Sequence, residues 1–194
     1  MPVFYAFMIV PSHIVGFDDL PFPPTHRGDV GVIGAVFTAT RLDGVLFTKV
    51  RRDGANATVK LAAAVQTSRF HGHLQLILLQ GIALAGFNVV DIHALHQSLG
   101  LPVLVVCRRR PDYGAIRQAL TTRVRGGKRK WRLIQRAGEM EAMEGVYVQR
   151  AGLSRETAAA VIRATAIHSR IPEPLRTSHI IATGLSPWGG RQRV

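Results

Sequence analysis

The chain has 194 residues, of which 47% are hydrophobic and 19% are charged, a composition that excludes intrinsic disorder. Cys107 is the single cysteine, which excludes a disulfide framework and any site built from several cysteines. The formal net charge of +13 favours a polyanionic partner, and the absence of an apolar run of roughly 18 residues argues against a membrane span.

These properties lead us to expect a cytoplasmic protein that makes no contact with membranes. The length predicts a single domain spanning residues 1–194, with residues 1–12 and 186–194 at its periphery. The positive charge is concentrated in the second half of the chain, since residues 98–194 hold 18 of the 25 Lys and Arg residues.

The N-terminal part of the sequence predicts three antiparallel strands. An apolar run over residues 13–17 ends at Asp18 and Asp19, because the prolines that follow remove backbone donors from a strand. Residues 30–40 and 45–51 are rich in β-branched and aromatic residues and are separated by an Asp-Gly turn. Both carboxylates are therefore expected at the carboxyl end of the first strand.

After residue 54, predicted helices alternate with predicted strands. Helices are expected over residues 55–66, 88–98, 112–122, 131–137, 154–168 and 172–184. Strands are expected over residues 74–79, 102–107 and 140–149. The order predicts an α/β fold with a mixed sheet, antiparallel first and parallel later, and with helices on both faces.

A basic segment is the strongest indication of function in the residues themselves. Residues 123–130 are expected to form a glycine-broken loop, in which Gly126 and Gly127 let the backbone follow a ligand. Cations there pair with phosphates, and a neighbouring indole stacks on an exposed base. The candidate nucleic-acid-binding residues are Arg108, Arg109, Arg110, Arg125, Lys128, Arg129, Lys130, Trp131 and Arg132. The alternative is a solvated loop with Trp131 in the core.

Other polar residues favour structural roles. Asp91 is interpreted as orienting a helix, and His93 and His96 lie one helical turn apart without an obvious third metal ligand. Cys107 is interpreted as a buried structural thiol. Asp18 and Asp19 remain open between metal ligands and a structural pair.

Four motifs give the chain a resemblance to a known family. They are VGFDD at 15–19, GIALAGFNVVDI at 81–92, LPVLVV at 101–106 and IPEPLR at 171–176. In this order they resemble a prokaryotic family described as domain of unknown function number ninety-nine, which looks like a relative of endonuclease V. The resemblance implies an RNase H-like domain.

Endonuclease V cuts a phosphodiester near a deaminated purine with a divalent metal held by carboxylates. The resemblance therefore implies a Mg²⁺ or Mn²⁺ ion on Asp18, with Asp19 as a further ligand or turned to the other face or the rim. It also implies catalytic positions at Asp18 and Gln80.

The sequence departs from this pattern at several places. Gln80 precedes Gly81 where an aspartate is expected, no glutamate occurs before Glu139, and Asn56 stands where the family has an aspartate. No histidine occurs in residues 149–153, where the nuclease has one. An amide does not neutralise a dication, so we predict a nucleic-acid-binding protein on an endonuclease V-like scaffold. The alternatives are an active metal-dependent endonuclease and a protein–protein adaptor.

Overall fold

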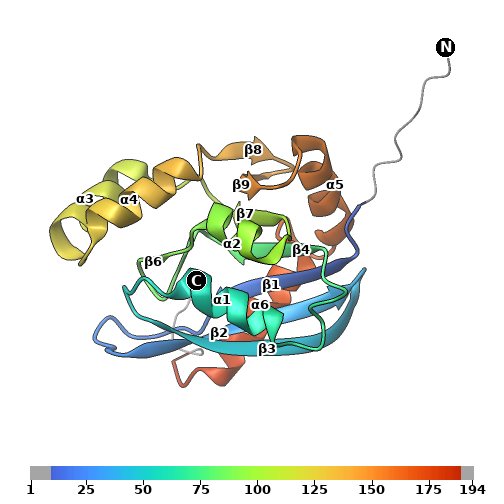
Figure 1. The fold of residues 1–194 in the computed structure, drawn as a ribbon, viewed down its shortest axis with the longest axis horizontal. Helices are drawn as coiled ribbons and strands as arrows, with labels where there is room; N and C mark the ends of the chain where they lie inside the picture. The colour runs from blue at the N-terminus through green and yellow to red at the C-terminus, as the bar shows by residue number, and fades with distance from the viewer. Residues whose placement is uncertain (1–9, 189–194) are drawn as a thin grey trace, which may run out of the picture.

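The computed structural model describes residues 10–188, and its centre is a seven-stranded sheet (Figure 1). The sheet has the strand order β3-β2-β1-β4-β7-β9-β8. Its strands are β1 (His13–Asp19), β2 (Asp29–Thr38), β3 (Arg41–Arg51), β4 (Leu76–Gln80), β7 (Val103–Cys107), β8 (Glu141–Met143) and β9 (Val146–Ala151). Strands β1, β4 and β7 are parallel, whereas all other neighbouring pairs are antiparallel. The predicted mixed α/β sheet is confirmed.

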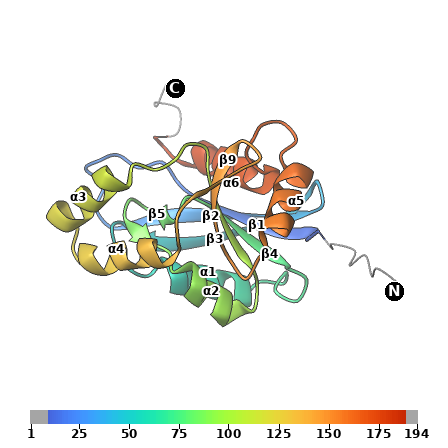
Figure 2. The ribbon, with the colours of Figure 1, turned by 90° about the horizontal axis from the view of Figure 1, so that it is seen from above.

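Helices cover both faces of the sheet, as predicted (Figures 1 and 2). On one face, Val15 and Phe17 of β1 join a buried cluster with α1 (Ala57–Gln66) and α2 (Ile92–Leu99). On the other, Ile14 joins a second cluster with α5 (Arg155–Thr165) and α6 (Glu173–Leu185). The alternation follows from the period of two along a strand. Helices α3 (Tyr113–Arg123) and α4 (Gly127–Arg136) pack against each other at one end of the molecule.

The predicted basic loop over residues 123–130 is wrong, because most of it is helical. Helix α3 runs through Arg123 and α4 begins at Gly127. Gly126 has a φ of +71° at the start of α4, and a Cβ on Gly127 would lie 1.7 Å from the carbonyl oxygen of Leu120. The two glycines therefore let two helices approach closely, and they do not supply a pliable loop.

The predicted strand over residues 140–149 is a hairpin of two strands, β8 and β9. Its turn is formed by Glu144 (φ 48°) and Gly145 (φ 77°). Two consecutive residues with positive φ are typical of the tight turns that match the twist of an antiparallel pair. The hairpin therefore extends the sheet beyond β7 with antiparallel strands.

A small second sheet of β5 (Ala83–Leu84) and β6 (Asn88–Val89) separates β4 from α2. The helix predicted from residue 88 therefore begins only at Ile92, where the Asp91 side chain accepts a hydrogen bond from the Ala94 amide at 3.0 Å. The segment 82–90 is too short, and its hydrophobic residues too irregularly spaced, for the sequence pattern to distinguish a two-residue strand from the start of a helix.

Buried Asn88 connects this small sheet to α1. Its amide nitrogen donates to the Arg51 carbonyl and to Asn56 Oδ1, and its own Oδ1 accepts from the Ala57 amide at 3.0 Å. Asn56 precedes α1, but its side chain makes no capping bond to that helix. Asn88 therefore satisfies a backbone donor at the start of α1 that the residue preceding the helix leaves unbonded.

Of the segments expected at the periphery, residues 10–12 and 186–188 are described, while residues 1–9 and 189–194 lie outside the described part. The Ser12 amide donates to Gln75 Oε1 at 2.8 Å, and Ser186 Oγ donates to the Pro21 carbonyl at 2.7 Å. Within residues 10–188, none of the helices has the length and hydropathy needed to cross a bilayer.

Candidate functional site

The carboxyl ends of β1 and β4 place Asp18 and Gln80 side by side on the face covered by α6. Phe17 pairs with Leu79 in parallel register, so the next residues along the two strands adjoin. The Asp18 side chain is 9% exposed. Gln80 Oε1 is buried and accepts no hydrogen bond from the described residues. The two predicted catalytic positions therefore meet at one edge of the sheet.

Helix α6 brings a third side chain, His179, to this edge. The helix lies directly on β1 because Gly16 has no side chain, and a Cβ there would lie 2.5 Å from the carbonyl carbon of Pro174. From Gly16 to Asp18 the strand rises about 6.6 Å, and four residues of helix from Leu175 rise about 6 Å. His179 thus reaches the level of Asp18, and its Nδ1 lies 2.7 Å from Asp18 Oδ2.

Asp18 and His179 form a hydrogen-bonded pair. The hydrogen bond that His179 makes to the Asp18 carboxylate raises the pKa of His179, although burial and the charge of Arg108 act in the opposite direction. The other carboxylate oxygen, Asp18 Oδ1, accepts the backbone amide of Asp19 at 3.0 Å. The His179 side chain remains 54% exposed, so this pair has one buried member and one accessible member.

Asp19 points to the opposite face of the sheet. Its Oδ2 accepts a hydrogen bond from the Ala85 amide at 2.9 Å. Burial and the neighbouring charge of Asp18 raise the pKa of Asp19 to about 6, against the lowering effect of the Ala85 amide. Of the two placements expected for Asp19, beside Asp18 as a metal ligand or turned to the other face or the rim, the structure has the second.

These donors do not fit a site for two divalent cations. Within residues 10–188, no three His, Cys, Asp or Glu side chains come together in a way that would hold a metal ion. Both oxygens of Asp18 already accept hydrogen bonds, and Gln80 offers a neutral amide oxygen. Paired hard dications need clustered carboxylates, and this edge supplies one.

Seven of the predicted nucleic-acid-binding cations are exposed. They have no ion-pair partner among the described residues, and they are Arg108, Arg109, Arg110, Arg125, Lys128, Arg129 and Arg132. Elsewhere several arginines are neutralised, as in the pairs of Arg136 with Asp91 and Arg150 with Glu141. The uncompensated charge is therefore prominent after β7 and along α4.

Lys130 differs from its neighbours because it is buried. It is 3% exposed, and its Nζ donates to the backbone carbonyl of Asp53. Burial lowers the pKa of Lys130, with Asp53 acting in the opposite direction. Lys130 therefore fastens α4 to the turn after β3 and is not presented to a ligand.

Trp131 is half-buried and packs edge-on against Tyr113, with the ring centroids 6.2 Å apart. Both rings line a cavity of about 410 Å³ between α3 and α4, together with Ile134 and Gln135. Trp131 is thus neither a core residue nor a freely presented indole.

The remaining candidates have the structural roles expected of them. Asp91 caps α2, His93 Nε2 lies 3.1 Å from the Arg136 carbonyl, and His96 Nδ1 lies 2.8 Å from the Leu101 carbonyl. Burial raises the pKa of Cys107 to about 11, which keeps the thiol protonated.

Sequence reasoning missed His179, because the expected histidine was sought before α5 and not in the last helix. One signal was available in the sequence. His179 follows Leu175 of the IPEPLR motif by four residues, and residues four apart lie on the same face of a helix. The buried Leu175 therefore indicates that His179 faces the sheet.

Comparisons with known proteins agree with this architecture. The sequence model of the Endonuclease dU family matches residues 11–186. A UPF0215 protein from Deinococcus radiodurans is 55% identical over 175 residues, which cover 90% of this chain and 89% of the relative. The crystal structure of a protein of unknown function from Archaeoglobus fulgidus is similar with a TM-score of 0.84 and 32% identity, covering 90% of this chain and 98% of that one.

Endonuclease V from Ciona intestinalis, solved with a 24mer DNA containing an inosine followed by a ribo-adenosine, is similar with a TM-score of 0.56 and 15% identity. The match covers 90% of this chain and 85% of that chain, and it shows the shared fold. The predicted resemblance in sequence and the endonuclease V-like fold are both confirmed. The chain belongs to the Endonuclease dU family.

Proposed function

We propose that the protein binds nucleic acid, with the sugar-phosphate backbone running along the carboxyl edge of the sheet and onto α4. The observation that carries the proposal is the set of seven exposed cations between Arg108 and Arg132 that no acidic side chain neutralises. Unpaired Lys and Arg side chains attract phosphates and release their counterions on binding. Ciona Endonuclease V, which shares the fold, was solved with DNA, and this supports the same class of ligand.

The family name supplies the first DNA to test, which is a strand that contains deoxyuridine. Binding is measured on single-stranded and duplex DNA, with deoxyuridine or thymidine, over a series of salt concentrations. The variant K128Q/R129Q/R132Q removes three cations from α4. On duplex DNA we expect its slope of log K against log salt to be smaller by about 2.7, because each phosphate contact contributes about 0.9.

The matched control is K49Q/K60Q/R69Q, which removes the same charge from exposed positions on other elements. We expect the control to keep the slope of the wild type. A wild-type protein that shows no salt-dependent affinity for any of these DNAs, or for RNA of the same sequence, would overturn the proposal.

A second candidate function, phosphodiester hydrolysis, is favoured by the Asp18–His179 pair. A histidine held by a buried carboxylate and still accessible is suited to accept a proton from an attacking water. In this candidate Gln80 positions the water or the substrate. No step is assigned to a metal, because the donors at this edge do not fit a two-metal site.

The test for hydrolysis is cleavage of deoxyuridine-containing DNA by wild type, D18N and D29N, with and without Mg²⁺. Asp29 is exposed and pairs with Arg51, so D29N serves as the control. Cleavage lost in D18N and kept in D29N would establish hydrolysis and add it to binding. If cleavage requires Mg²⁺, the ion has ligands at the carboxyl edge in addition to Asp18 and Gln80. No cleavage by the wild type would leave the binding function alone.

A further inference from the structure

A hollow of about 450 Å³ opens between the end of β7 and the β8–β9 hairpin. Four arginines line it, and three of them directly follow β7. We call it the arginine hollow, and its residues are Arg108, Arg109, Arg110, Arg170 and residues 142, 143 and 145–147. Arg170 belongs to the segment between α5 and α6, so the hollow is completed by a part of the chain far from β7 in sequence.

The positive charge of the arginine hollow is not compensated by its surroundings. Its four arginines are exposed and have no ion-pair partner among the residues that the structure describes. The hairpin carries two acids, and both are engaged elsewhere: Glu144 pairs with Arg163 at 2.6 Å and Glu141 pairs with Arg150 at 2.9 Å. Guanidinium groups gathered in a concave surface match the oxygens of a phosphate group.

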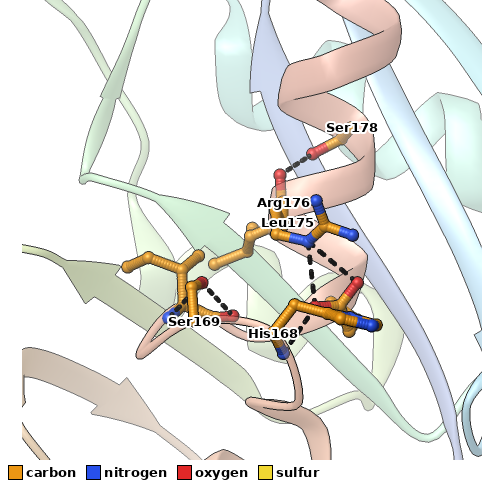
Figure 3. A network of polar contacts seen from close by, with 7 residues as sticks. His168, Ser169, Leu175, Arg176 and Ser178 are labelled. Atoms are coloured by element: carbon orange, nitrogen blue, oxygen red, sulfur yellow. Dashed lines mark hydrogen bonds and ion pairs between the residues drawn. The ribbon is translucent and has the colours of Figure 1, made fainter.

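The segment that carries Arg170 is held in place by buried Glu173, which accepts hydrogen bonds from two residues labelled in Figure 3, His168 and Arg176. The carboxylate of Glu173 accepts the His168 amide at 3.3 Å, and both of its oxygens accept Arg176 Nε at 2.9 and 3.0 Å. Burial acts to raise the pKa of Glu173, but these hydrogen bonds outweigh it and lower the pKa. The carboxylate is therefore ionised and keeps the chain on either side of Arg170 fixed.

Two further contacts restrict Arg170. Ser169 Oγ donates to the Ile171 carbonyl at 3.2 Å and accepts the Ile171 amide at 3.1 Å, which closes a tight loop around residue 170. A Cβ on Gly145 would lie 3.2 Å from Arg170 Cδ, so the arginine stem crosses the hairpin turn where a glycine leaves room. An arginine fixed in this way loses less conformational freedom when it binds a ligand.

The arginine hollow lies at the same edge of the sheet as the Asp18–His179 pair, because β1, β4 and β7 are parallel and three of its arginines directly follow β7. Strand β4 stands between β1 and β7, so the ends of these two strands are about 10 Å apart, or two interstrand spacings. The charge of Arg108 is also close enough to lower the pKa of His179.

We infer that the arginine hollow is a subsite for one backbone phosphate of a bound nucleic acid, at the same edge of the sheet as Asp18 and His179, with Arg170 as its fixed donor. The inference rests on the proposed function and adds the subsite and Arg170 to it. The inference also assigns the IPEPLR motif a role in positioning Arg170, because Glu173 and Arg176 of that motif hold the segment that carries this arginine.

The experiment compares R170Q, R170K and the control K60Q in binding to duplex DNA over a salt series. Removal of one phosphate contact should reduce the slope by about 0.9 in R170Q and leave it unchanged in K60Q. R170K keeps the charge but lacks the forked donor, so its slope should match the wild type while its affinity falls. If R170Q has the slope and affinity of the wild type, the subsite is overturned while nucleic-acid binding stands.

A second measurement separates the two proposals. The guanidinium Nε–H signals of the protein are followed by NMR as inorganic phosphate is added, with sodium chloride at equal ionic strength as the reference. A signal that is absent in R170Q and shifts with phosphate alone supports the subsite, even if DNA binding fails. A signal that shifts equally with chloride, or does not shift, overturns the subsite whatever the DNA measurements show.

Discussion

Asp18 and His179 are 161 residues apart in the chain, yet His179 Nδ1 lies 2.7 Å from Asp18 Oδ2. The contact depends on Gly16, which lets α6 lie on β1 at a distance that a Cβ would prevent. Asp18 on β1 and His179 on α6 therefore lie at the same level along the strand direction, at the carboxyl edge of the sheet.

The first prediction concerns the titration of His179. Because the hydrogen bond from His179 to the Asp18 carboxylate raises the pKa of His179, the substitution D18N should return this pKa toward the ordinary value of about 6.5. NMR titration of the imidazole signals measures the change. D91N is the control, since Asp91 lies on another element and pairs with Arg136. An unchanged titration of His179 in D18N would show that the pair does not exist in solution.

The second prediction concerns Asp19 and stability. Its pKa in the folded state is about 6, above the ordinary 3.8, so the folded protein holds this proton more tightly than the unfolded chain. Stability contributed by the protonated form is present at low pH and is lost as the pH rises between these two values. D19N should therefore add about 1–3 kcal/mol to the free energy of unfolding near pH 8 and almost nothing near pH 4.

Urea denaturation of wild type and D19N at both pH values tests this prediction. The asparagine oxygen still accepts the Ala85 amide, so the hydrogen bond of the wild type is retained. An equal effect of D19N at the two pH values would mean that the burial of this carboxylate has no consequence for its ionisation.

The third prediction separates two lysines on α4. Lys130 is buried and bonded to the Asp53 carbonyl, whereas Lys128 is exposed. K130Q should lower the free energy of unfolding by about 1–3 kcal/mol, because the partly buried Asp53 carbonyl loses its charged donor. K128Q should leave stability unchanged and reduce the salt slope of duplex DNA binding by about 0.9. The reverse assignment, with K130Q changing the slope, would place Lys130 at the ligand.

The fourth prediction concerns the contact between α6 and β1. G16A should destabilise the protein by about 1–3 kcal/mol, because its methyl group would overlap the backbone at Pro174 and push α6 away from β1. It should also lower the pKa of His179, since the helix carries that histidine.

G184A is the matched control for G16A. Gly184 lies in α6 with no atom within 4 Å of an added Cβ, so alanine there should stabilise the protein by about 0.5–1 kcal/mol. Chemical denaturation and the His179 titration are the measurements. A G16A protein as stable as wild type would contradict the close approach of the helix.

The fifth prediction concerns divalent cations. A metal bound at about 100 times its Kd stabilises a protein by about 2.7 kcal/mol. Because the carboxyl edge supplies a single carboxylate on the α6 face, we expect a Kd above about 10 mM for Mn²⁺ or Mg²⁺. Either ion at about 10 mM should then raise the free energy of unfolding by less than about 0.4 kcal/mol. Thermal unfolding with Ca²⁺ as the reference ion tests this. A larger Mn²⁺ effect that disappears in D18N would show that the edge does bind metal.

Much of the fold follows from local patterns in the sequence. The prolines after Asp19 end β1 where expected, and Ser154 caps α5 with its side chain on the Thr157 amide. These features depend on residues within a few positions of one another. The same holds for the pairing of Glu173 with Arg176, which are three residues apart on one helix.

The parts that the sequence did not predict depend on contacts between distant segments. Lys130 resembles its basic neighbours, and only the packing of α4 against the turn at Asp53 makes it a buried residue. His179 and Arg170 joined the site because α6 and the segment before it fold back onto β1 and the β8–β9 hairpin. No pattern of composition or period carries that information, since it arises from the topology of the sheet.

The position of α6 in the chain order has a consequence for biosynthesis. Asp18 leaves the ribosome early, whereas its partner His179 and the loop around Arg170 are translated only after the whole sheet. A nascent or prematurely terminated chain that stops before residue 170 has every strand but lacks Arg170, His179 and the whole of α6. Such a product leaves the apolar side chains under α6 uncovered and Asp18 without its histidine partner.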